Sequence, residues 1–226
     1  MKPQPKQTEP LCAAMTDVPY HVRPSRYHVQ DDLMPKEWLN MATAEFSRHR
    51  DALTWDHGDG YGDRACWIVR DAREQYPQLC AALIQTLYQA IPDAVKACGI
   101  PEFQPTGIEV CQTLYHHGGY FRWHDDMNDH GGNFRIDRRL TFIYYLNRMP
   151  KLFSGGDLEF MDGCTIEVQN NRLLMFEPMQ VHRVQPVECW SADPLDGRWT
   201  ITGWIHGDAP KEYTDRLLSL RAEKPS

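Results

Sequence analysis

The spacing of hydrophobic residues changes once along the chain, from helical periods to short strand-like runs. Residues 35–53 and 73–91 place apolar side chains three and four positions apart, which predicts two amphipathic helices. Pro92 is expected to end or kink the second helix, or else residues 94–98 add another turn. Residues 55–65 between the helices are rich in glycine and aspartate, so they predict a loop or a loose hairpin.

From about residue 106 the chain consists of short runs rich in β-branched and aromatic residues, most of them separated by Gly, Asn, Asp or Pro. The eight runs are GIEVCQTLY, YFRWHDD, RRLTFIYYLN, GGDLEF, CTIEVQ, NRLLMFEP, HRVQPVE and RWTITGWIH. Eight strands at this spacing predict an antiparallel sandwich or barrel, of which the jelly roll is the commonest eight-stranded form. We therefore expect a mainly β, α+β fold with the helices on one outer face.

The chain shows no internal repeat and no strong linker, so its 226 residues predict a single domain. Residues 1–16 are polar and contain prolines, and we expect them to form a loose tail. Residues 17–105 are predicted to be a helical support region, and residues 106–207 the jelly-roll core.

Composition and charge narrow the classes of function. The 42% share of hydrophobic residues and the 24% share of charged residues are ordinary for a soluble globular protein. A formal net charge of −7 disfavours a nucleic-acid partner, and no apolar run predicts a membrane span or a signal peptide. The seven cysteines are widely spaced without a Cys-x-x-Cys motif, which favours reduced thiols in a cytoplasmic protein.

One His-x-Asp pair, His124 and Asp126, stands out among four by its context. The other three are His49-Arg50-Asp51, His57-Gly58-Asp59 and His206-Gly207-Asp208. They fall in a predicted helix, in a glycine-rich loop and at the end of the last strand. Residues two apart on a strand share a face, so His124 and Asp126 should project together while Asp125 faces the other way.

His182 offers a third ligand, because it follows an apolar run and begins another predicted strand. Two histidines and one carboxylate leave coordination positions open, which suits non-haem Fe(II) and not a closed four-ligand zinc site. Taken alone, His182 is better explained as an ordinary histidine at the end of a strand.

Arg198 begins the predicted strand in GRWTITGW, with Thr200, Thr202 and Trp204 on its side by parity. A charged arginine inside a barrel is costly unless a partner neutralises it. A small dicarboxylate is a fitting partner, because a guanidinium group binds a carboxylate through two hydrogen bonds. The alternative is that Arg198 faces solvent or pairs with Asp196.

Six motifs in order carry a family resemblance over residues 108–206. They are Tyr115-x-x-Gly118, His124-x-Asp126, RRLTFIYYLN, SGGDLEF, NRLLMFEPMQVHRVQPV and RWTITGW. Together they resemble the 2-oxoglutarate- and Fe(II)-dependent dioxygenases of the prolyl 4-hydroxylase-like branch. The resemblance implies a double-stranded β-helix, the jelly-roll or cupin-like barrel, as the catalytic core. It also implies Fe(II) as cofactor, 2-oxoglutarate and O2 as cosubstrates, and ascorbate as an accessory reductant.

The same resemblance implies roles for individual residues. The iron ligands would be His124, Asp126 and His182, and the residues around 2-oxoglutarate would be Arg198, Thr202, Tyr145 and Tyr115. The neighbouring Tyr144 would point the other way and pack. The expected reaction hydroxylates a C–H bond of a peptidyl or free amino acid and releases succinate and CO2. An intact carboxylate at position 126 favours hydroxylation over halogenation.

Two alternatives to this function remain at the level of sequence. The substrate could instead be a small biosynthetic metabolite, which needs a closed cavity where a peptide needs an open groove. The barrel could also be a non-catalytic cupin-like module holding Zn or Mn, in which case Arg198 need not point toward the metal. Residues 55–63 and 127–137 read either as a lid over the site or as solvated loops, and Arg138 and Arg139 are expected to pair with Asp137 or Asp129.

Overall fold

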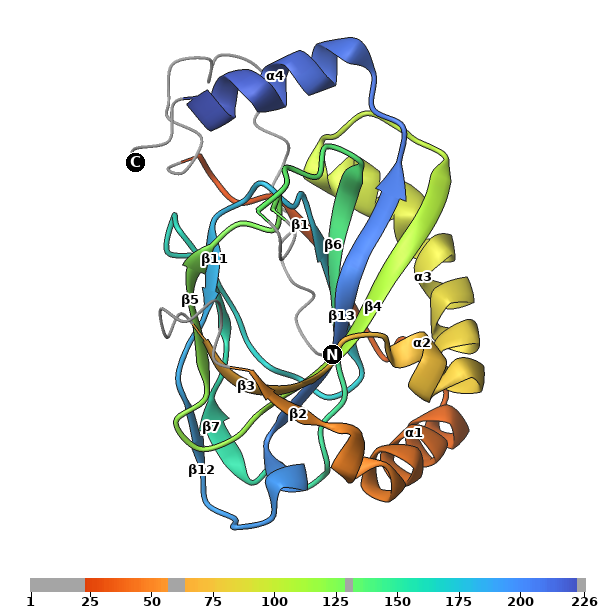
Figure 1. Cartoon of the computed structure of the whole chain (residues 1–226), viewed down its shortest axis with the longest axis vertical. Helices are drawn as coiled ribbons and strands as arrows, with labels where there is room; N and C mark the ends of the chain where they lie inside the picture. The colour runs from red at the N-terminus through yellow and green to blue at the C-terminus, as the bar shows by residue number, and fades with distance from the viewer. Residues whose placement is uncertain (1–22, 57–63, 129–131, 223–226) are drawn as a thin grey trace, which may run out of the picture.

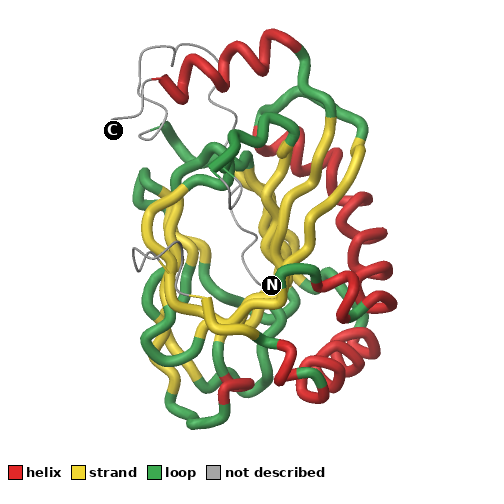
Figure 2. The backbone as a smooth tube through the Cα atoms, viewed as in Figure 1, coloured by secondary structure: helices red, strands yellow, loops and turns green. Residues whose placement is uncertain are grey.

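Helices cover one face of a strongly curled antiparallel sheet, and the opposite face of that sheet lines the inside of a barrel (Figures 1 and 2). The computed structural model describes residues 23–56, 64–128 and 132–222. The tail predicted at residues 1–16 lies outside this described part. No helix in the described ranges is both long and apolar enough to span a membrane.

The strands of the described ranges form one continuous sheet and a separate two-stranded pair. The continuous sheet has the order β1-β10-β6-β13-β4-β3-β5-β11-β8-β9 with β2 beside β3, and the pair is β12-β7. The strands are β1 (Tyr27–Asp31), β2 (Thr54–Asp56), β3 (Arg64–Val69), β4 (Pro105–Tyr115), β5 (Tyr120–His124), β6 (Arg138–Tyr145), β7 (Phe153–Gly155), β8 (Leu158–Phe160), β9 (Thr165–Ile166), β10 (Arg172–Phe176), β11 (His182–Val184), β12 (Val187–Cys189) and β13 (Arg198–Gly207).

Strand β3 joins the two walls of the barrel. Its end at Trp67–Val69 pairs with β4, and its start at Arg64 and Ala65 pairs with β5. The curled sheet that results is the expected double-stranded β-helix, so the predicted α+β fold class is confirmed.

All eight predicted strand runs contain strand, and the run HRVQPVE forms two, β11 and β12. Pro186 lies between them and has no N–H to donate to a ladder, which explains the break. The segment predicted to be helical contributes three strands as well, because β1 pairs with β10 and the hairpin β2–β3 joins the main sheet. That hairpin matches one of the two readings of residues 55–65, although residues 57–63 lie outside the described ranges.

The helices are α1 (Lys36–Arg48), α2 (Ala72–Gln75), α3 (Pro77–Cys98) and α4 (Lys211–Ala222), with short 3-10 turns η2 (Arg50–Ala52) and η3 (Pro194–Asp196). The single helix predicted from residue 73 is broken at Tyr76, because the residue before a proline disfavours the helical region. Helix α3 then runs through Pro92 and ends at Cys98, where it is capped by Gly99, whose φ of 66° suits glycine. Helix α4 was not predicted.

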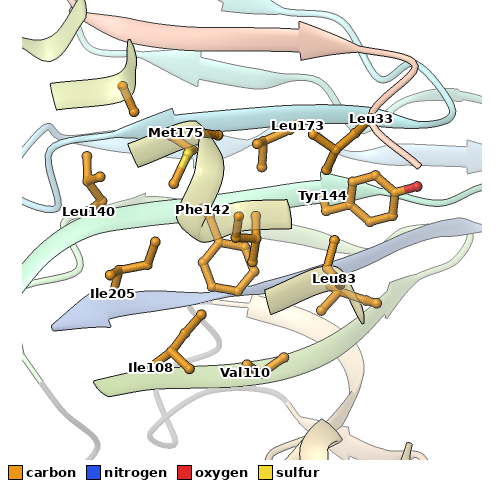
Figure 3. Close-up of a cluster of buried hydrophobic side chains, with 14 of the residues drawn as sticks. Leu33, Leu83, Ile108, Val110, Leu140, Phe142, Tyr144, Leu173, Met175 and Ile205 are labelled. Atoms are coloured by element: carbon orange, nitrogen blue, oxygen red, sulfur yellow. The ribbon is translucent and has the colours of Figure 1, made fainter. Parts of the chain in front are cut away.

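The alternation of side chains on β6 separates the helix-facing core from the barrel interior. Phe142 and Tyr144 pack in the cluster that includes Leu83 and Leu87 of α3 (Figure 3). Ile143 and Tyr145 belong to a second buried cluster on the barrel side. Tyr144 therefore packs as predicted, whereas Tyr145 faces the interior.

We expect Leu83→Ala to lower the free energy of unfolding by about 2–5 kcal/mol, because Leu83 is fully buried between α3 and the sheet. Gln85 is exposed on the same helix, so Gln85→Ala should change that free energy by less than about 0.5 kcal/mol. Chemical denaturation of both variants checks this. Equal losses would contradict the assigned packing face of α3.

Candidate active site

The pairing of β5 with β11 brings His124 and His182 together. The two residues are direct partners in the antiparallel register, and their ring centroids lie 4.3 Å apart. Side chains that oppose each other across antiparallel strands share a face. The predicted start of a strand at His182 is therefore confirmed, and the histidines meet inside the barrel.

Asp126 joins His124 and His182 to complete the triad. The sequence predicted that Asp126 lies on the same strand as His124, but it lies in a bend after that strand. Strand β5 ends at His124. The backbone N–H of Asp126 donates to the Pro178 carbonyl at 2.8 Å, and the Thr141 hydroxyl donates to Asp126 Oδ2 at 2.7 Å. These bonds hold the carboxylate 3.8 Å from His124 Nε2 and 3.7 Å from His182 Nε2.

Both imidazoles are oriented for metal binding through Nε2. His124 Nδ1 lies 2.7 Å from the Arg122 carbonyl, and His182 Nδ1 lies 2.8 Å from the Gln180 carbonyl. A carbonyl oxygen only accepts, so each Nδ1 carries the proton and each Nε2 keeps its lone pair. Burial, together with the neighbouring His182, lowers the pKa of His124 to about 3, so its imidazole is neutral.

The triad fits a divalent metal ion. One ligand atom from each of His124, Asp126 and His182 can be chosen so that all lie within 4.8 Å of one another. Among the residues that the structure describes, the triad is the one group of three or more such side chains with this geometry. Three protein ligands on one side leave the remaining positions to substrates, as in non-haem iron sites.

The other His-x-Asp pairs do not build a site in the described ranges. His206 bridges Glu109 and Asp137 through its two ring nitrogens at 2.9 and 2.8 Å. His49 lies 3.3 Å from Glu45 on α1. The pair at residues 57–59 lies outside the described residues.

Phe121 belongs to the site although strand parity places it on the opposite face from His124. The register pairs His182 with His124 but Val184 with Phe121, so β5 carries one extra residue. This β-bulge turns Phe121 inward, where its ring stacks on the His124 ring. The two ring centroids lie 3.5 Å apart. The sequence gives no signal for the bulge.

A cavity of about 300 Å³ contains the triad and Arg198. Its wall also includes Thr200, Thr202 and Trp204, so the predicted parity of β13 is confirmed. Arg198 is 1% exposed, and Asp196 instead pairs with Arg148 and accepts from the Ser191 hydroxyl, so the alternative in which Arg198 faces solvent or pairs with Asp196 is wrong. Because the Arg198 guanidinium group lines the same cavity as the triad, the alternative of a non-catalytic, cupin-like metal-binding module is disfavoured.

The surroundings of Arg198 fit a bound carboxylate. Its Nε donates to the Gly156 carbonyl at 2.6 Å, and its guanidinium carbon lies 5.0 and 5.1 Å from the rings of Tyr115 and Tyr145. In the described part of the chain, Arg198 and Tyr145 lie side by side, but neither Arg198 Nη2 nor the Tyr145 hydroxyl makes a well-formed hydrogen bond. Buried polar groups are normally paired, so these two donors mark a place for an acidic ligand.

Gly156 is required for this arrangement. A Cβ built on Gly156 would lie 2.7 Å from Arg198 Cδ, and the residue has a φ of 74°. The SGGDLEF motif therefore makes room for the arginine side chain.

The remaining predicted residues line the site in different ways. Tyr115 opposes Arg198 across β4 and β13 and lines the cavity. The Thr202 hydroxyl also lines it but donates to the Phe142 carbonyl at 2.9 Å, so its proton is already used.

Arg138 and Arg139 do not pair with Asp137, one of the two predicted partners, and the other, Asp129, lies outside the described residues. Arg138 pairs with Glu109 at 2.9 Å, and Arg139 donates to the carbonyls of Asp208 and Pro101. Asp137 pairs instead with Arg135, two residues before it in the chain, and with His206 of β13.

Comparison with known proteins agrees with this site. Residues 111–206 match the model of the 2OG-Fe(II) oxygenase superfamily. An uncharacterised PKHD-type hydroxylase of Synechocystis is 30% identical over 145 residues, which are 58% of this chain and 47% of that protein. The match thus spans about half the length of this relative.

Two solved structures share the fold. A prolyl-4-hydroxylase of Pseudomonas putida is 23% identical with a TM-score of 0.57, covering 82% of this chain and 94% of its own. A prolyl hydroxylase of Trichoplax adhaerens, in complex with a hypoxia inducible factor peptide fragment, is 17% identical with a TM-score of 0.59. It covers 89% of this chain and 88% of its own.

Residues 111–206, which form most of the barrel core, are thus similar to the 2OG-Fe(II) oxygenase superfamily, and the triad fits that similarity. The two structural neighbours named above are prolyl hydroxylases, the group that the sequence motifs resemble. The family implies Fe(II) at the triad and 2-oxoglutarate beside it, and the donors described above fit both groups.

We expect Asp126→Ala to weaken Mn(II) binding by about 100-fold or more, because it removes the charged ligand of the triad. Asp51→Ala, in the exposed pair at residues 49–51, should leave the affinity unchanged. Isothermal titration of Mn(II) into the metal-free proteins measures both. Equal affinities in the two variants would refute the assignment of Asp126.

Proposed function

We propose that this chain is an Fe(II)- and 2-oxoglutarate-dependent dioxygenase that hydroxylates a C–H bond of a peptidyl or free amino acid. The observation that carries the proposal is the presence of the triad and the buried Arg198 in one cavity. A metal site alone would fit many activities, whereas an arginine without a carboxylate partner beside it fits a dicarboxylate cosubstrate.

In this proposal His124, Asp126 and His182 hold the iron, and Arg198 binds the distal carboxylate of 2-oxoglutarate. Tyr145 donates a hydroxyl proton to the same carboxylate. When bound, the iron supplies the oxidative decarboxylation of 2-oxoglutarate by O2 and the oxidation of the substrate. Ascorbate would serve as an accessory reductant.

The protein's own contribution is orientation and exclusion of water. Phe121 covers one face of His124, and Ile143, Leu158 and Val184 give the cavity apolar walls. Apolar walls keep water from the reacting groups and strengthen the electrostatic interactions among them. Tyr115 and Thr202 shape the pocket around the cosubstrate.

A substrate that enters by one side chain suits the size of the site. About 300 Å³ lies at the lower end of small-molecule pockets, and 2-oxoglutarate would take part of it. The Trichoplax neighbour, in complex with a peptide fragment, supports a peptidyl substrate by analogy of fold.

Two further expectations belong to the proposal. Residues 106–207 would be the catalytic core, with residues 17–105 as its support. A cytoplasmic location agrees with the described cysteines, all of which are free thiols.

The wild-type protein should release succinate from 2-oxoglutarate only when Fe(II) is present, slowly alone and faster with a substrate peptide. His182→Ala should abolish this release, because two ligands hold the metal too weakly. Succinate is measured by mass spectrometry, and Gln85→Ala serves as the folded control. If His182→Ala released succinate at the wild-type rate, the proposed function would be wrong.

Variants of the adjacent residues Tyr145 and Tyr144 test cosubstrate binding and packing separately. Tyr145→Phe should raise the KM for 2-oxoglutarate roughly tenfold or more, because it removes a hydrogen bond to a charged group. Tyr144→Phe, whose hydroxyl bonds Asn171 on the other face at 2.7 Å, should lower stability and leave that KM unchanged. Steady-state kinetics and thermal unfolding of the two variants measure both effects. The role of Tyr145 is wrong if the two variants show the same KM.

A further inference from the structure

Arg138 is buried directly behind the metal-binding triad and is not part of it. Its side chain is 3% exposed, and one terminal nitrogen, Nη1, donates to the Asp126 carbonyl at 2.7 Å and to the Asn128 carbonyl at 3.2 Å. The other terminal nitrogen donates to Glu109 at 2.9 Å. The guanidinium carbon lies 3.6 Å from the centroid of Trp204, which lines the cavity.

These contacts fix a segment that no strand holds. Asp126 follows the end of β5. Its N–H donates to the Pro178 carbonyl, and its carboxylate accepts from the Thr141 hydroxyl. Arg138 supplies the bond to its carbonyl, so Asp126 is held at three separate points. A further backbone bond, from Arg135 to Met127, ties the same segment to the residues before β6.

A β-bulge places Arg138 there. The ladder between β13 and β6 pairs Ile205 with Leu140 and then His206 with Arg138, so it skips Arg139. Arg138 therefore reaches the side of Trp204 and Asp126, while Arg139 turns toward Tyr213 of α4, 4.5 Å from its ring.

A buried cation close to a metal site must be neutralised, and Glu109 does this. Burial alone would raise the pKa of Glu109, but hydrogen bonds from His206 and Arg138 outweigh it and hold that pKa at about 2. Glu109 thus stays ionised and pairs with Arg138. Arg135, in the segment before β6, and His206, near the end of β13, also contact Glu109 at 3.2 and 2.9 Å and so hold the pair from two elements.

We propose that Arg138 is a positioning residue that sets the metal affinity of the triad, by clamping the backbone of Asp126 and Asn128 while Glu109 neutralises its charge. The inference rests on the proposed metal site but not on the identity of the reaction. Groups that orient a metal ligand commonly change metal affinity by about tenfold to a hundredfold when they are removed.

The test compares Arg138 with its neighbour Arg139, because the two arginines donate to backbone carbonyls of different segments. Both are buried, and both donate to two backbone carbonyls, but Arg139 holds residues 101 and 208 away from the triad. Mn(II), a redox-stable substitute for Fe(II), is titrated calorimetrically into metal-free wild type, Arg138→Gln and Arg139→Gln. Thermal unfolding of the same metal-free proteins measures stability separately.

We expect Arg138→Gln to weaken Mn(II) binding by about tenfold to a hundredfold and Arg139→Gln by less than about threefold. Both variants should lose stability, because each leaves carbonyl groups without a donor. Glu109→Gln should weaken Mn(II) binding as well, since it leaves a buried positive charge near the metal. If Arg138→Gln does not fold, Arg138→Lys is used, which keeps the charge but cannot bridge all three oxygen atoms.

Loss of stability without a difference in Mn(II) affinity between the two arginine variants would overturn the positioning role and leave the proposed function intact. Failure of wild type to bind Mn(II) would overturn both. A selective loss in Arg138→Gln supports the role of Arg138 even if no succinate release is found, so the two proposals fail separately.

Discussion

The buried charge of Arg198 is the constraint on which the rest of the site depends. A guanidinium group that is 1% exposed costs several kcal/mol to bury unless its protons are satisfied. The protein supplies one carbonyl oxygen, from Gly156, and the faces of two tyrosine rings. In the proposed function, the cost that remains is recovered when the carboxylate of 2-oxoglutarate binds. The metal triad lies in the same cavity as Arg198.

The two walls of the barrel carry different parts of the site. The β13 wall carries Arg198 and is braced from outside by α3, through residues such as Phe142 and Leu83. The wall of β5 and β11 carries the two histidines, and its register alone brings them together. Asp126 lies beyond the end of β5, so polar bonds hold it where a ladder cannot. The charged ligand of the triad is thus positioned by hydrogen bonds, and the neutral ligands by strand pairing.

The sequence predicted most of the barrel and of the site because both rest on alternation along strands. Parity correctly placed Arg198, Thr202 and Trp204 on one face and separated Tyr144 from Tyr145. It failed where the ladder is irregular, since an extra residue turned Phe121 inward and a skipped residue turned Arg138 toward the site. Bulges depend on contacts between distant segments, which one sequence does not reveal.

In the support region the sequence did not predict β1, and it predicted the hairpin β2–β3 only as one of two readings, for a related reason. β1 lies at the edge of the sheet and β3 lies between β4 and β5, and their partners, β10, β4 and β5, come much later in the chain. Their short runs carry little pattern of their own, because pairing and burial decide strand formation more than local preference does. Helix α4 likewise depends on burial of Tyr213, Leu217 and Leu220 against the barrel.

The most direct test of the account is calorimetric titration of 2-oxoglutarate into anaerobic, Fe(II)-loaded protein, with Arg198→Ala and Arg198→Lys measured beside wild type. The account predicts binding that requires the metal, falls by about 100-fold in Arg198→Ala and is partly retained in Arg198→Lys. Failure of folded, Fe(II)-loaded wild type to bind 2-oxoglutarate, or equal binding by wild type and Arg198→Ala, would contradict it.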